Sequence, residues 1–518
     1  MTSLLDAPPT LGAAPATEAG RFDALQQRLA PQFEAVFPHE QLPRTVVVVP
    51  SLSLDPAELA KVAGVHHYEE RLLCMLMLLR MPRTHLVYVT SEPVHPTIID
   101  YYLHLLPGIP VSHARRRLTL LSCHDASAVP LTRKILDRPR LLRRLRAEIE
   151  DPHAAHLTCF NASPLERQLA VRLGIPLYAT DPALAHLGSK SGSRKLFREA
   201  GVAMPDGAED LRDEDDLVEA LAALHGRHPA MRRAVVKLNE GFSGEGNALF
   251  SFEGAPEGGG VAAWIRAALP RRLRFEAEAE TWAAFRAKFA AMGGIAECFI
   301  EGAHKRSPSA QCRINPLGQI TPISTHDQVL GGPSGQIFLG CRFPADAAYR
   351  MAIQEAGLRV ADVLRRHGAL GRFGVDFISV REGDAWRHYA IEVNLRKGGT
   401  THPFLMLQYL TDGAYDPATG RYRTPAGQPR AYYASDNLCR PDYRGLSPDD
   451  LIDIAVCHGL HFHGATQQGV VFHLIGALSE FGKLGVVCIG DTIARARALY
   501  RHTVEVLDAE TEDGTATC

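Results

Sequence analysis

The chain has 518 residues, of which 46% are hydrophobic and 22% are charged, and its formal net charge is −2. A chain of this length accommodates about three domains. The near-neutral balance excludes the strongly basic class that binds nucleic acid or an anionic membrane, so we expect neither partner.

Residues 1–43 are predicted to form an N-terminal tail. The first 20 residues lack the basic start and long apolar block of a signal peptide, and no later stretch reaches the about 18 apolar residues of a membrane span. The ten cysteines contain no CxxC pair, which is typical of reduced thiols and not of a disulfide scaffold or a zinc site. We therefore expect a cytoplasmic protein.

Residues 44–186 alternate short apolar runs with helical ones. The expected strands include "RTVVVVPSLSL", "THLVYVTS", "RLTLLSC", "AHLTCFNAS" and "IPLYAT", with helical segments between them. Strand and helix in turn predict a parallel sheet covered on both faces, as in a Rossmann-like α/β domain. No GxGxxG follows any of these strands, so dinucleotide binding has little support.

A different pattern begins at residue 187. The segment "SKSGSRKLFREAGVAMP" reads as a helix capped by Ser189, and the strand 232–239 is followed by the glycine-rich turn "NEGFSGEGN" and a return strand. From residue 295 strands follow one another with one long helix among them, which predicts a mostly antiparallel α+β arrangement. We predict one domain over 187–415, divided at about residue 293.

The end of the chain is predicted to form a small C-terminal α+β domain over 436–518, after a turn-rich linker at 416–435. It contains His458, His461 and His463, but no cysteine or carboxylate follows at ligand spacing. We therefore expect core or surface histidines here and not a zinc site.

Polar side chains in three segments suit one charged ligand. In "IEVNLRKGGTTHP", Glu392, Asn394 and Arg396 alternate with apolar residues, so they share one side of an extended strand. Carboxylate and amide oxygens, with Asp376 on an earlier strand, suit Mg²⁺. Two lysines, Lys190 and Lys237, together with the N–H groups of a glycine loop, suit a triphosphate.

Two further observations bear on that ligand. No GxxxxGK[ST] occurs, which argues against a P-loop ATPase. Only nine of the 56 basic residues are lysines, which suggests that lysine is kept where a compact ammonium is needed.

The order of these motifs resembles the ATP-grasp superfamily. A lysine at the start of a helix ending "AGVAMP", a strand lysine with a glycine loop, "ECFIEG", "GVDF" and "IEVNLR" occur in its order over residues 187 to about 410. The α/β domain ahead of them resembles the preceding domain of that family. The forms "IEVNLRKGGTTHP" and "STHDQVLGGPSGQIFLGCRFP" are most similar to ATP-grasp peptide ligases of the pheganomycin type.

The resemblance implies a role for each matching residue. The implied nucleotide-binding residues are Lys190, Lys237, Gly241, Ser243, Gly244, Gly246, Glu297, Cys298, Phe299, Ile300 and His304. The implied metal ligands are Asp376, Glu392 and Asn394, and Arg396 would face the transferring phosphate and the developing oxyanion. Arg313 is a candidate second cation for the intermediate, and His326, Asp327 and Arg342 are candidate substrate-binding residues.

Each of these residues also has a plain structural reading. Lys237 could be a strand-edge lysine before an ordinary hairpin turn, and Lys190 could be a solvated helix residue. Asp376 with Glu392 and Arg396 could form a structural ion pair, and Arg313 could lie at the surface. Taken together and in this order, the motifs favour the ATP-grasp interpretation.

The expected function is an ATP-dependent carboxylate–amine ligase. With ATP and Mg²⁺, a small carboxylic acid would become an acyl phosphate, and an amino acid or peptide amine would displace phosphate to give an amide. The alternatives are an ATP-grasp enzyme with another acceptor, as in a carboxylase or a thioester-forming ligase, and a non-catalytic ATP-binding protein. No biotin-carrying segment is present, and a homodimer is a further expectation from the resemblance.

Overall fold

The structure is a computed structural model that describes residues 17–36, 39, 41–54, 56–241, 246–256, 258–277, 280–331 and 337–511. Ser243 and Gly244, which the resemblance places in the phosphate loop, lie outside these residues. Within the described ranges, no helix combines the length and apolar character that crossing a membrane requires.

The first part of the chain forms the predicted parallel sheet. Its four strands are β1 (Arg44–Val49), β2 (Thr84–Thr90), β3 (Leu118–Ser122) and β4 (Ala155–Cys159), in the order β3-β2-β1-β4. All residues of β1 and β4 are buried, as expected for strands covered on both faces. The surrounding helices are α3 (Pro56–Leu59), η1 (Val65–Arg80), α4 (Pro96–His104), α5 (Val111–Arg115), α6 (Leu131–Leu136), α7 (Pro139–Ala147), α8 (Pro164–Leu173) and η2 (Pro182–Gly188).

Two details of this region differ from the predictions. The predicted tail contains helices α1 (Glu18–Gln26) and α2 (Leu29–Val36), and Gln26 hydrogen-bonds both backbone groups of Leu177. The buried side chain of Phe22 packs into the domain core, so this segment is part of the fold. The expected strand at 175–180 contributes only a single bridge, from Leu177 to Leu157 of β4, and Gln26 binds the backbone groups of Leu177.

The second part of the chain forms a lid sheet with its own core. Its strands are β5 (Gly207–Leu211), β9 (Gly294–Cys298), β6 (Arg233–Leu238), β7 (Asn247–Ser251) and β8 (Leu273–Phe275), in that spatial order. The associated helices are α9 (Lys190–Glu199), α10 (Glu214–Arg227), α11 (Val261–Arg272) and α12 (Trp282–Met292). The predicted hairpin β6–β7 and the Ser189 cap of α9 are confirmed.

A second, larger antiparallel sheet carries the predicted metal-site strands. Its nine strands are β10 (Lys305–Arg306), β11 (Pro308–Ile314), β12 (Ile320–Gly331), β13 (Ile337–Phe343), β14 (Gly371–Glu382), β15 (Ala385–Asn394), β18 (Ala431–Cys439), β19 (Gly469–His473) and β20 (Lys483–Gly490). Helix α13 (Arg350–Arg366) packs against β11 and β12. The predicted succession of antiparallel strands is therefore confirmed.

The C-terminal elements extend this larger sheet. Tyr433 of β18 lies opposite Arg342 of β13, and β18 in turn pairs with β20. The predicted linker is not irregular, because it contains most of the hairpin formed by β16 (Ala414–Asp416) and β17 (Arg421–Arg423) and the first half of β18. The remaining elements are α14 (Thr401–Thr411), η3 (Pro441–Tyr443), α15 (Pro448–Cys457), η4 (Ile475–Ala477), α16 (Leu478–Phe481) and α17 (Ile493–Thr511).

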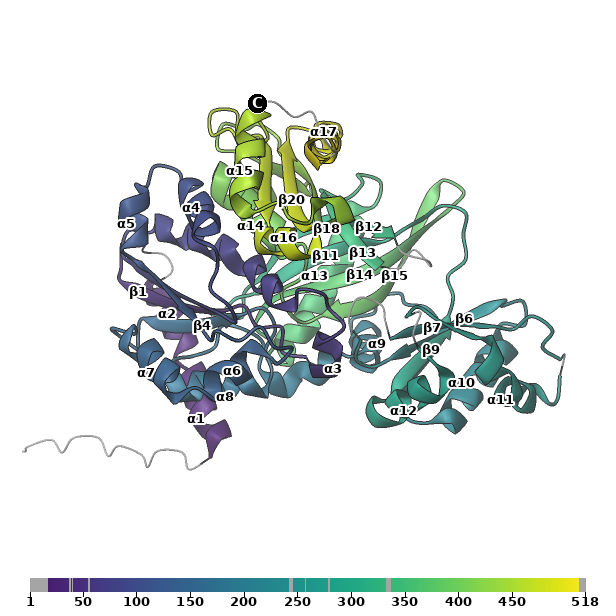
Figure 1. The fold of residues 1–518 in the computed structure, drawn as a ribbon. Helices are drawn as coiled ribbons and strands as arrows, with labels where there is room; N and C mark the ends of the chain where they lie inside the picture. Colours follow the sequence, from purple (N-terminus) through teal and green to yellow (C-terminus); the bar gives the residue numbers. More distant parts are fainter. Residues whose placement is uncertain are drawn as a thin grey trace, which may run out of the picture.

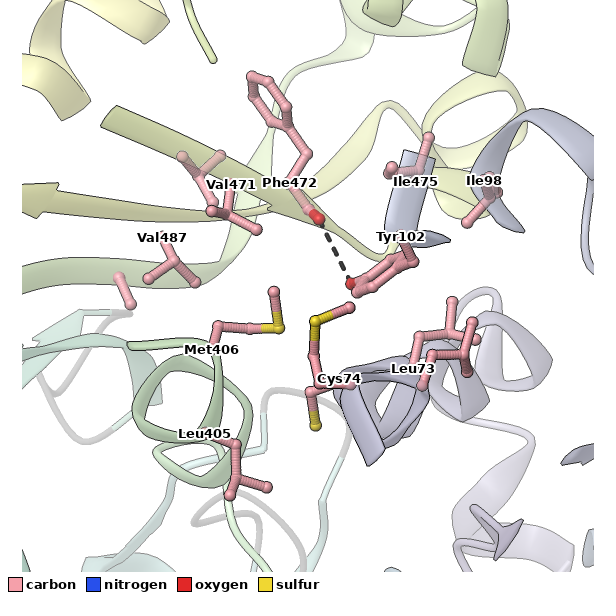
Figure 2. Packing of buried hydrophobic residues seen from close by; sticks show 14 of the residues in the cluster. Leu73, Cys74, Ile98, Tyr102, Leu405, Met406, Val471, Phe472, Ile475 and Val487 are labelled. Carbon is pink, nitrogen blue, oxygen red and sulfur yellow. Dashed lines mark hydrogen bonds between the residues drawn. The ribbon is translucent and has the colours of Figure 1, made fainter. Parts of the chain in front are cut away.

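One hydrophobic core joins the N-terminal and C-terminal regions (Figure 2). Cys74 of η1 and Tyr102 of α4 pack with Met406 of α14 and Val487 of β20. The Tyr102 hydroxyl donates to the Phe472 carbonyl oxygen of β19 at 3.4 Å. In Figure 1 the C-terminal elements accordingly lie against both the parallel sheet and the large sheet, whereas the lid sheet projects to one side.

Truncation of a buried methionine tests this shared core. Met406 has no exposed surface, so Met406→Ala should lower the free energy of unfolding by about 2–5 kcal/mol. Met292 is 38% exposed, so the control Met292→Ala should change it by less than about 0.5 kcal/mol. Urea denaturation followed by circular dichroism measures both. Equal losses in the two variants would contradict the assignment of Met406 to the core.

Candidate functional site

A cavity of about 1160 Å³ lies where the lid sheet, the large sheet, the end of β4 and the C-terminal elements meet. The predicted site residues that line it are Lys190, Lys237, Gly241, Glu297, Cys298, Phe299, Ile300, Arg342, Asp376, Glu392, Asn394 and Arg396. The strand that carries Lys237 therefore faces the strand that carries Asp376 across one cavity.

The acidic end of the cavity is built by neighbouring strands. In the antiparallel pair β14–β15, Asp376 lies directly opposite Glu392, and the Asn394 side-chain amide donates to Asp376 Oδ2 at 2.9 Å. Burial and the adjacent Glu392 charge raise the pKa of Asp376 to about 7. Burial alone would raise the pKa of Glu392 as well, but its ion pair with Lys190 lowers it below the usual value.

A buried charge cluster holds the second lysine. Lys237 Nζ lies 2.5 Å from Glu297 Oε1, and Arg194 Nη1 lies 3.2 Å from the other oxygen of that carboxylate. All three side chains are at most 7% exposed, and Arg194 also donates to the Pro205 carbonyl at 2.9 Å. Because a buried charge without partners is costly, this network fixes the position of Lys237.

The glycine turn after β6 has a narrow base. The Leu238 amide donates to the Gly246 carbonyl at 2.9 Å. A Cβ on Gly241 would lie 3.3 Å from the backbone of Gly246, a contact too close for most side chains. The close approach therefore favours glycine at positions 241 and 246, where the ends of the loop meet.

The end of β15 is anchored to the parallel sheet. Lys397 Nζ donates to the Cys159 carbonyl at 2.6 Å and to Thr158 Oγ1 at 3.0 Å, both at the carboxyl end of β4. The neighbouring Arg396 lies 5.9 Å from the Phe160 ring centroid. This anchor orients the strand end, so that Arg396 lies beside Glu392 and Asp376 in the cavity wall.

Five of the predicted site residues that the structure describes do not line this cavity: Gly246, at the base of the glycine turn, and four others. His326 is buried and its Nε2 lies 2.6 Å from the Tyr432 hydroxyl, while Asp327 accepts from the Tyr349 hydroxyl at 2.6 Å. Both occupy a stretch of β12 that is buried on its two faces. Arg313 lies opposite Arg372, further along β11 than the cavity-lining Ser309 and Gln311. His304 is exposed, at a turn before β10.

Within the described residues, the C-terminal histidines are not part of a cluster of three potential metal ligands. His458 pairs with Glu510 at 2.7 Å, and the rings of His461 and His463 lie 4.2 Å apart. Clusters of three potential ligands in the described ranges occur elsewhere, at His66, His67 and Glu480 and at Asp206, His228 and Cys298.

The sequence analysis did not identify several other residues of the cavity, because they come from segments that are far apart in the chain. They include Tyr68 and Arg71 of η1, Phe160 after β4, Lys305 and Arg306 of β10, Asp436 of β18, Arg444 after η3, and Lys483 of β20. The scarcity of lysine in the sequence could have identified some of these residues, because the few lysines are concentrated in the cavity. Five of the nine lysines, at positions 61, 190, 237, 305 and 483, line the cavity.

Replacing Lys237 tests the nucleotide end of the cavity. Loss of a charged donor should raise the dissociation constant of a non-hydrolysable ATP analogue by about 10-fold to 100-fold in Lys237→Met. The control Lys195→Met removes a lysine whose side chain is 54% exposed on α9 and should leave binding unchanged. Isothermal titration calorimetry measures both constants. Equal affinities in the two variants would show that Lys237 does not bind the nucleotide.

Comparisons with known proteins agree with this geometry. The family described as IQCH-like, ATP-grasp matches residues 182–253 and 268–418, and the PGM1 C-terminal domain matches residues 450–503. The chain is 35% identical over 448 residues to the L-propargylglycine–L-glutamate ligase of Streptantibioticus cattleyicolor, covering 85% of this chain and 89% of that one.

Two more distant matches were found, one in sequence and one in structure. The chain is 22% identical over 516 residues to the IQ motif-containing protein H of Danio rerio, covering 90% of this chain but about half, 48%, of that protein. The biotin carboxylase domain of the Hydrogenobacter thermophilus 2-oxoglutarate carboxylase has a TM-score of 0.54 at 12% identity, covering 90% of each chain. The similarity to the Streptantibioticus cattleyicolor ligase confirms the predicted resemblance: the chain belongs to the ATP-grasp superfamily, among its carboxylate–amine ligases.

Proposed function

We propose that this ATP-grasp ligase joins a small carboxylic acid to the amine of an amino acid or peptide, with release of ADP and phosphate. One observation carries the proposal: Lys237, the Asp376–Glu392–Asn394 set and Arg396 line a single cavity. The name of the 35% identical relative, a ligase of two amino acids, supports amino acids as the substrate class.

The donor set fits Mg²⁺. Asp376, Glu392 and Asn394 offer oxygen atoms from two paired strands, and hard divalent cations prefer such ligands. The raised pKa of Asp376, about 7, follows from its burial and from the Glu392 charge opposite it, a repulsion that a divalent cation would relieve. When bound, Mg²⁺ would neutralise charge on the phosphate oxygens.

The nucleotide is proposed to lie between the lid sheet and the acidic pair. Lys237 and Lys190 would contact its phosphates, and the segment Glu297–Ile300 would contact adenine. The Phe299 ring in this segment has the Arg233 guanidinium 4.0 Å and Lys305 Nζ 4.1 Å from its centroid, so its position is fixed from two sides. Because the Glu297 carboxylate forms ion pairs with Lys237 and Arg194, adenine would be bound by backbone groups and apolar surface of this segment.

The reaction needs charge neutralisation and positioning more than covalent help from the protein. A substrate carboxylate oxygen attacks the γ-phosphorus, the bond to the bridging oxygen breaks, and ADP leaves with the electron pair. The amine nitrogen then attacks the acyl carbon, a proton is lost from nitrogen, and phosphate leaves with the electrons of the carbon–oxygen bond. Arg396, beside the acidic pair, stabilises the negative charge that develops on the acyl oxygen.

ADP release across a panel of acids and amines, with mass detection of products, tests this function. The ligase function predicts an amide mass only when ATP, an acid and an amine are all present. ADP formation with a phosphorylated product and no amide would indicate a kinase, and dependence on bicarbonate would indicate a carboxylase. ATP binding without any turnover would overturn the proposal in favour of a binding protein.

We further propose that the protein is cytoplasmic and that it forms a homodimer. The buried thiols of Cys74, Cys123, Cys159, Cys312, Cys341 and Cys488 support a reducing compartment. Sedimentation equilibrium of the purified chain distinguishes a dimer from a monomer.

A further inference from the structure

Part of the cavity wall carries positive charge that the nucleotide does not account for. The part of the lining that comes from η1, β13, β18 and the elements after β18 includes the cations Arg71, Arg342, Arg444, Lys483 and Arg497 and, among the described residues, one carboxylate, Asp436. In Figure 1 those C-terminal elements lie on the other side of the strands β14 and β15 from most of the lid sheet.

Two of these cations share one aromatic ring. The Arg71 guanidinium lies 4.0 Å from the Tyr68 ring centroid, and Lys483 Nζ lies 4.8 Å from it. Lys483 also donates a hydrogen bond to the Tyr68 hydroxyl. Within the described residues Lys483 forms no ion pair with a carboxylate. The lysine and the arginine lie at one ring and are both partly shielded from water. A bound anion would stabilise their two positive charges.

A carboxylate lies next to this pair of cations. Arg71 Nη2 is 3.2 Å from Asp436 Oδ2, and the two side chains are 13% and 11% exposed. The Arg71 backbone carbonyl is held by His402 Nδ1 at 3.1 Å, so the position of Arg71 is fixed from the α14 side as well. Cations and one acid in this arrangement offer partners for both ends of a zwitterion.

This region adjoins the proposed transfer site. The Arg71 guanidinium lies 5.6 Å from the Phe160 ring centroid and the Arg396 guanidinium lies 5.9 Å from it, so both cations border the same ring in the cavity wall. A ligand held by Arg71 and Lys483 would therefore extend toward Arg396 and the acidic pair.

We propose that this end of the cavity binds the carboxyl donor as an acidic amino acid, an inference that rests on the ligase function proposed above. The side-chain carboxylate lies against Lys483 and Arg71 beside Tyr68, the ammonium lies against Asp436, and the α-carboxylate points toward Arg396 for phosphorylation. The C-terminal elements thus select the donor by charge.

Equilibrium binding tests the inference without relying on turnover. Calorimetry with the full chain saturated with Mg-ADP compares L-glutamate and L-aspartate with L-glutamine and L-asparagine. We expect the acids to bind at least about 10-fold more tightly than their amides, as one charge-assisted hydrogen bond provides. Lys483→Met should abolish that preference and leave the affinity for Mg-ADP unchanged, and Lys483→Arg should restore part of it.

The controls separate this inference from the ligase function. Lys195→Met, on the exposed face of α9, should keep the preference for acids. Equal binding of acids and amides by the unaltered chain, or an unchanged preference in Lys483→Met, would overturn the inference. Amide synthesis from neutral acids only would overturn the inference while leaving the ligase function standing. Selective binding of acids, without ADP release for any acid and amine, would support the binding inference and overturn the ligase function.

Discussion

Arg396→Met is expected to lower kcat for ADP release by about 10²-fold to 10³-fold, the effect of removing one charge-stabilising donor from a transition state. The dissociation constant for Mg-ADP should change little, because Lys190 and Lys237 remain to bind the phosphates. Arg396 lines the cavity beside the acidic pair, and Lys397 holds the strand end that positions it. Steady-state kinetics with separate measurement of nucleotide binding resolves the two effects.

Arg381→Met is the matched control for that variant. Arg381 lies on β14, its side chain is 48% exposed, and it pairs with Asp384 at the surface. Its replacement should leave kcat unchanged. If Arg396→Met kept full turnover, or lost nucleotide affinity in proportion to its rate, Arg396 would not be the residue that faces the reacting phosphate.

Glu392→Gln is expected to raise the Mg²⁺ concentration required for half-maximal ADP release by at least about 100-fold. Loss of a residue that only orients a metal ligand already costs about 10-fold to 100-fold in metal affinity, so loss of a ligand should cost no less. The substitution also removes the charge that pairs with Lys190. Titration of activity with Mg²⁺ measures the shift, and electron paramagnetic resonance of bound Mn²⁺ measures metal affinity without turnover.

Glu382→Gln provides the comparison for the metal prediction. Glu382 is at the far end of β14, is 50% exposed and pairs with Arg387 at the surface. Its replacement should leave the Mg²⁺ requirement unchanged. An unaltered Mn²⁺ affinity in Glu392→Gln would show that Glu392 forms only a structural ion pair with Lys190 and is not a metal ligand.

The parts of the site that could be predicted from sequence are those set by local geometry. Alternation along β15 places Glu392 and Asn394 on one side, Arg396 follows two residues after the strand ends, and all three lie in the cavity wall. Lys237 precedes a glycine turn in a local hairpin, which needs only short-range pairing. These residues depend on neighbours within their own strand or on the next one.

The predicted residues that lie outside the cavity wall depend on register and on burial from both faces. Arg313 could not be placed because its position depends on its pairing with Arg372, after a bulge at Gln311 and Cys312. His326 and Asp327 lie where β12 is covered on both faces, so alternation does not distinguish the cavity side from the core. Arg71 and Asp436 are 365 residues apart, and no local pattern links them.

The continuous pairing from β13 through β18 to β20 limits how this enzyme can be re-engineered. A chain cut before β18 would leave β13 with an unpaired backbone edge, which invites self-association between copies. Exchange of the C-terminal part between related ligases would also have to preserve the contacts of Tyr102 and Met406. New substrate preferences are therefore better sought by point substitutions inside the cavity than by swapping modules.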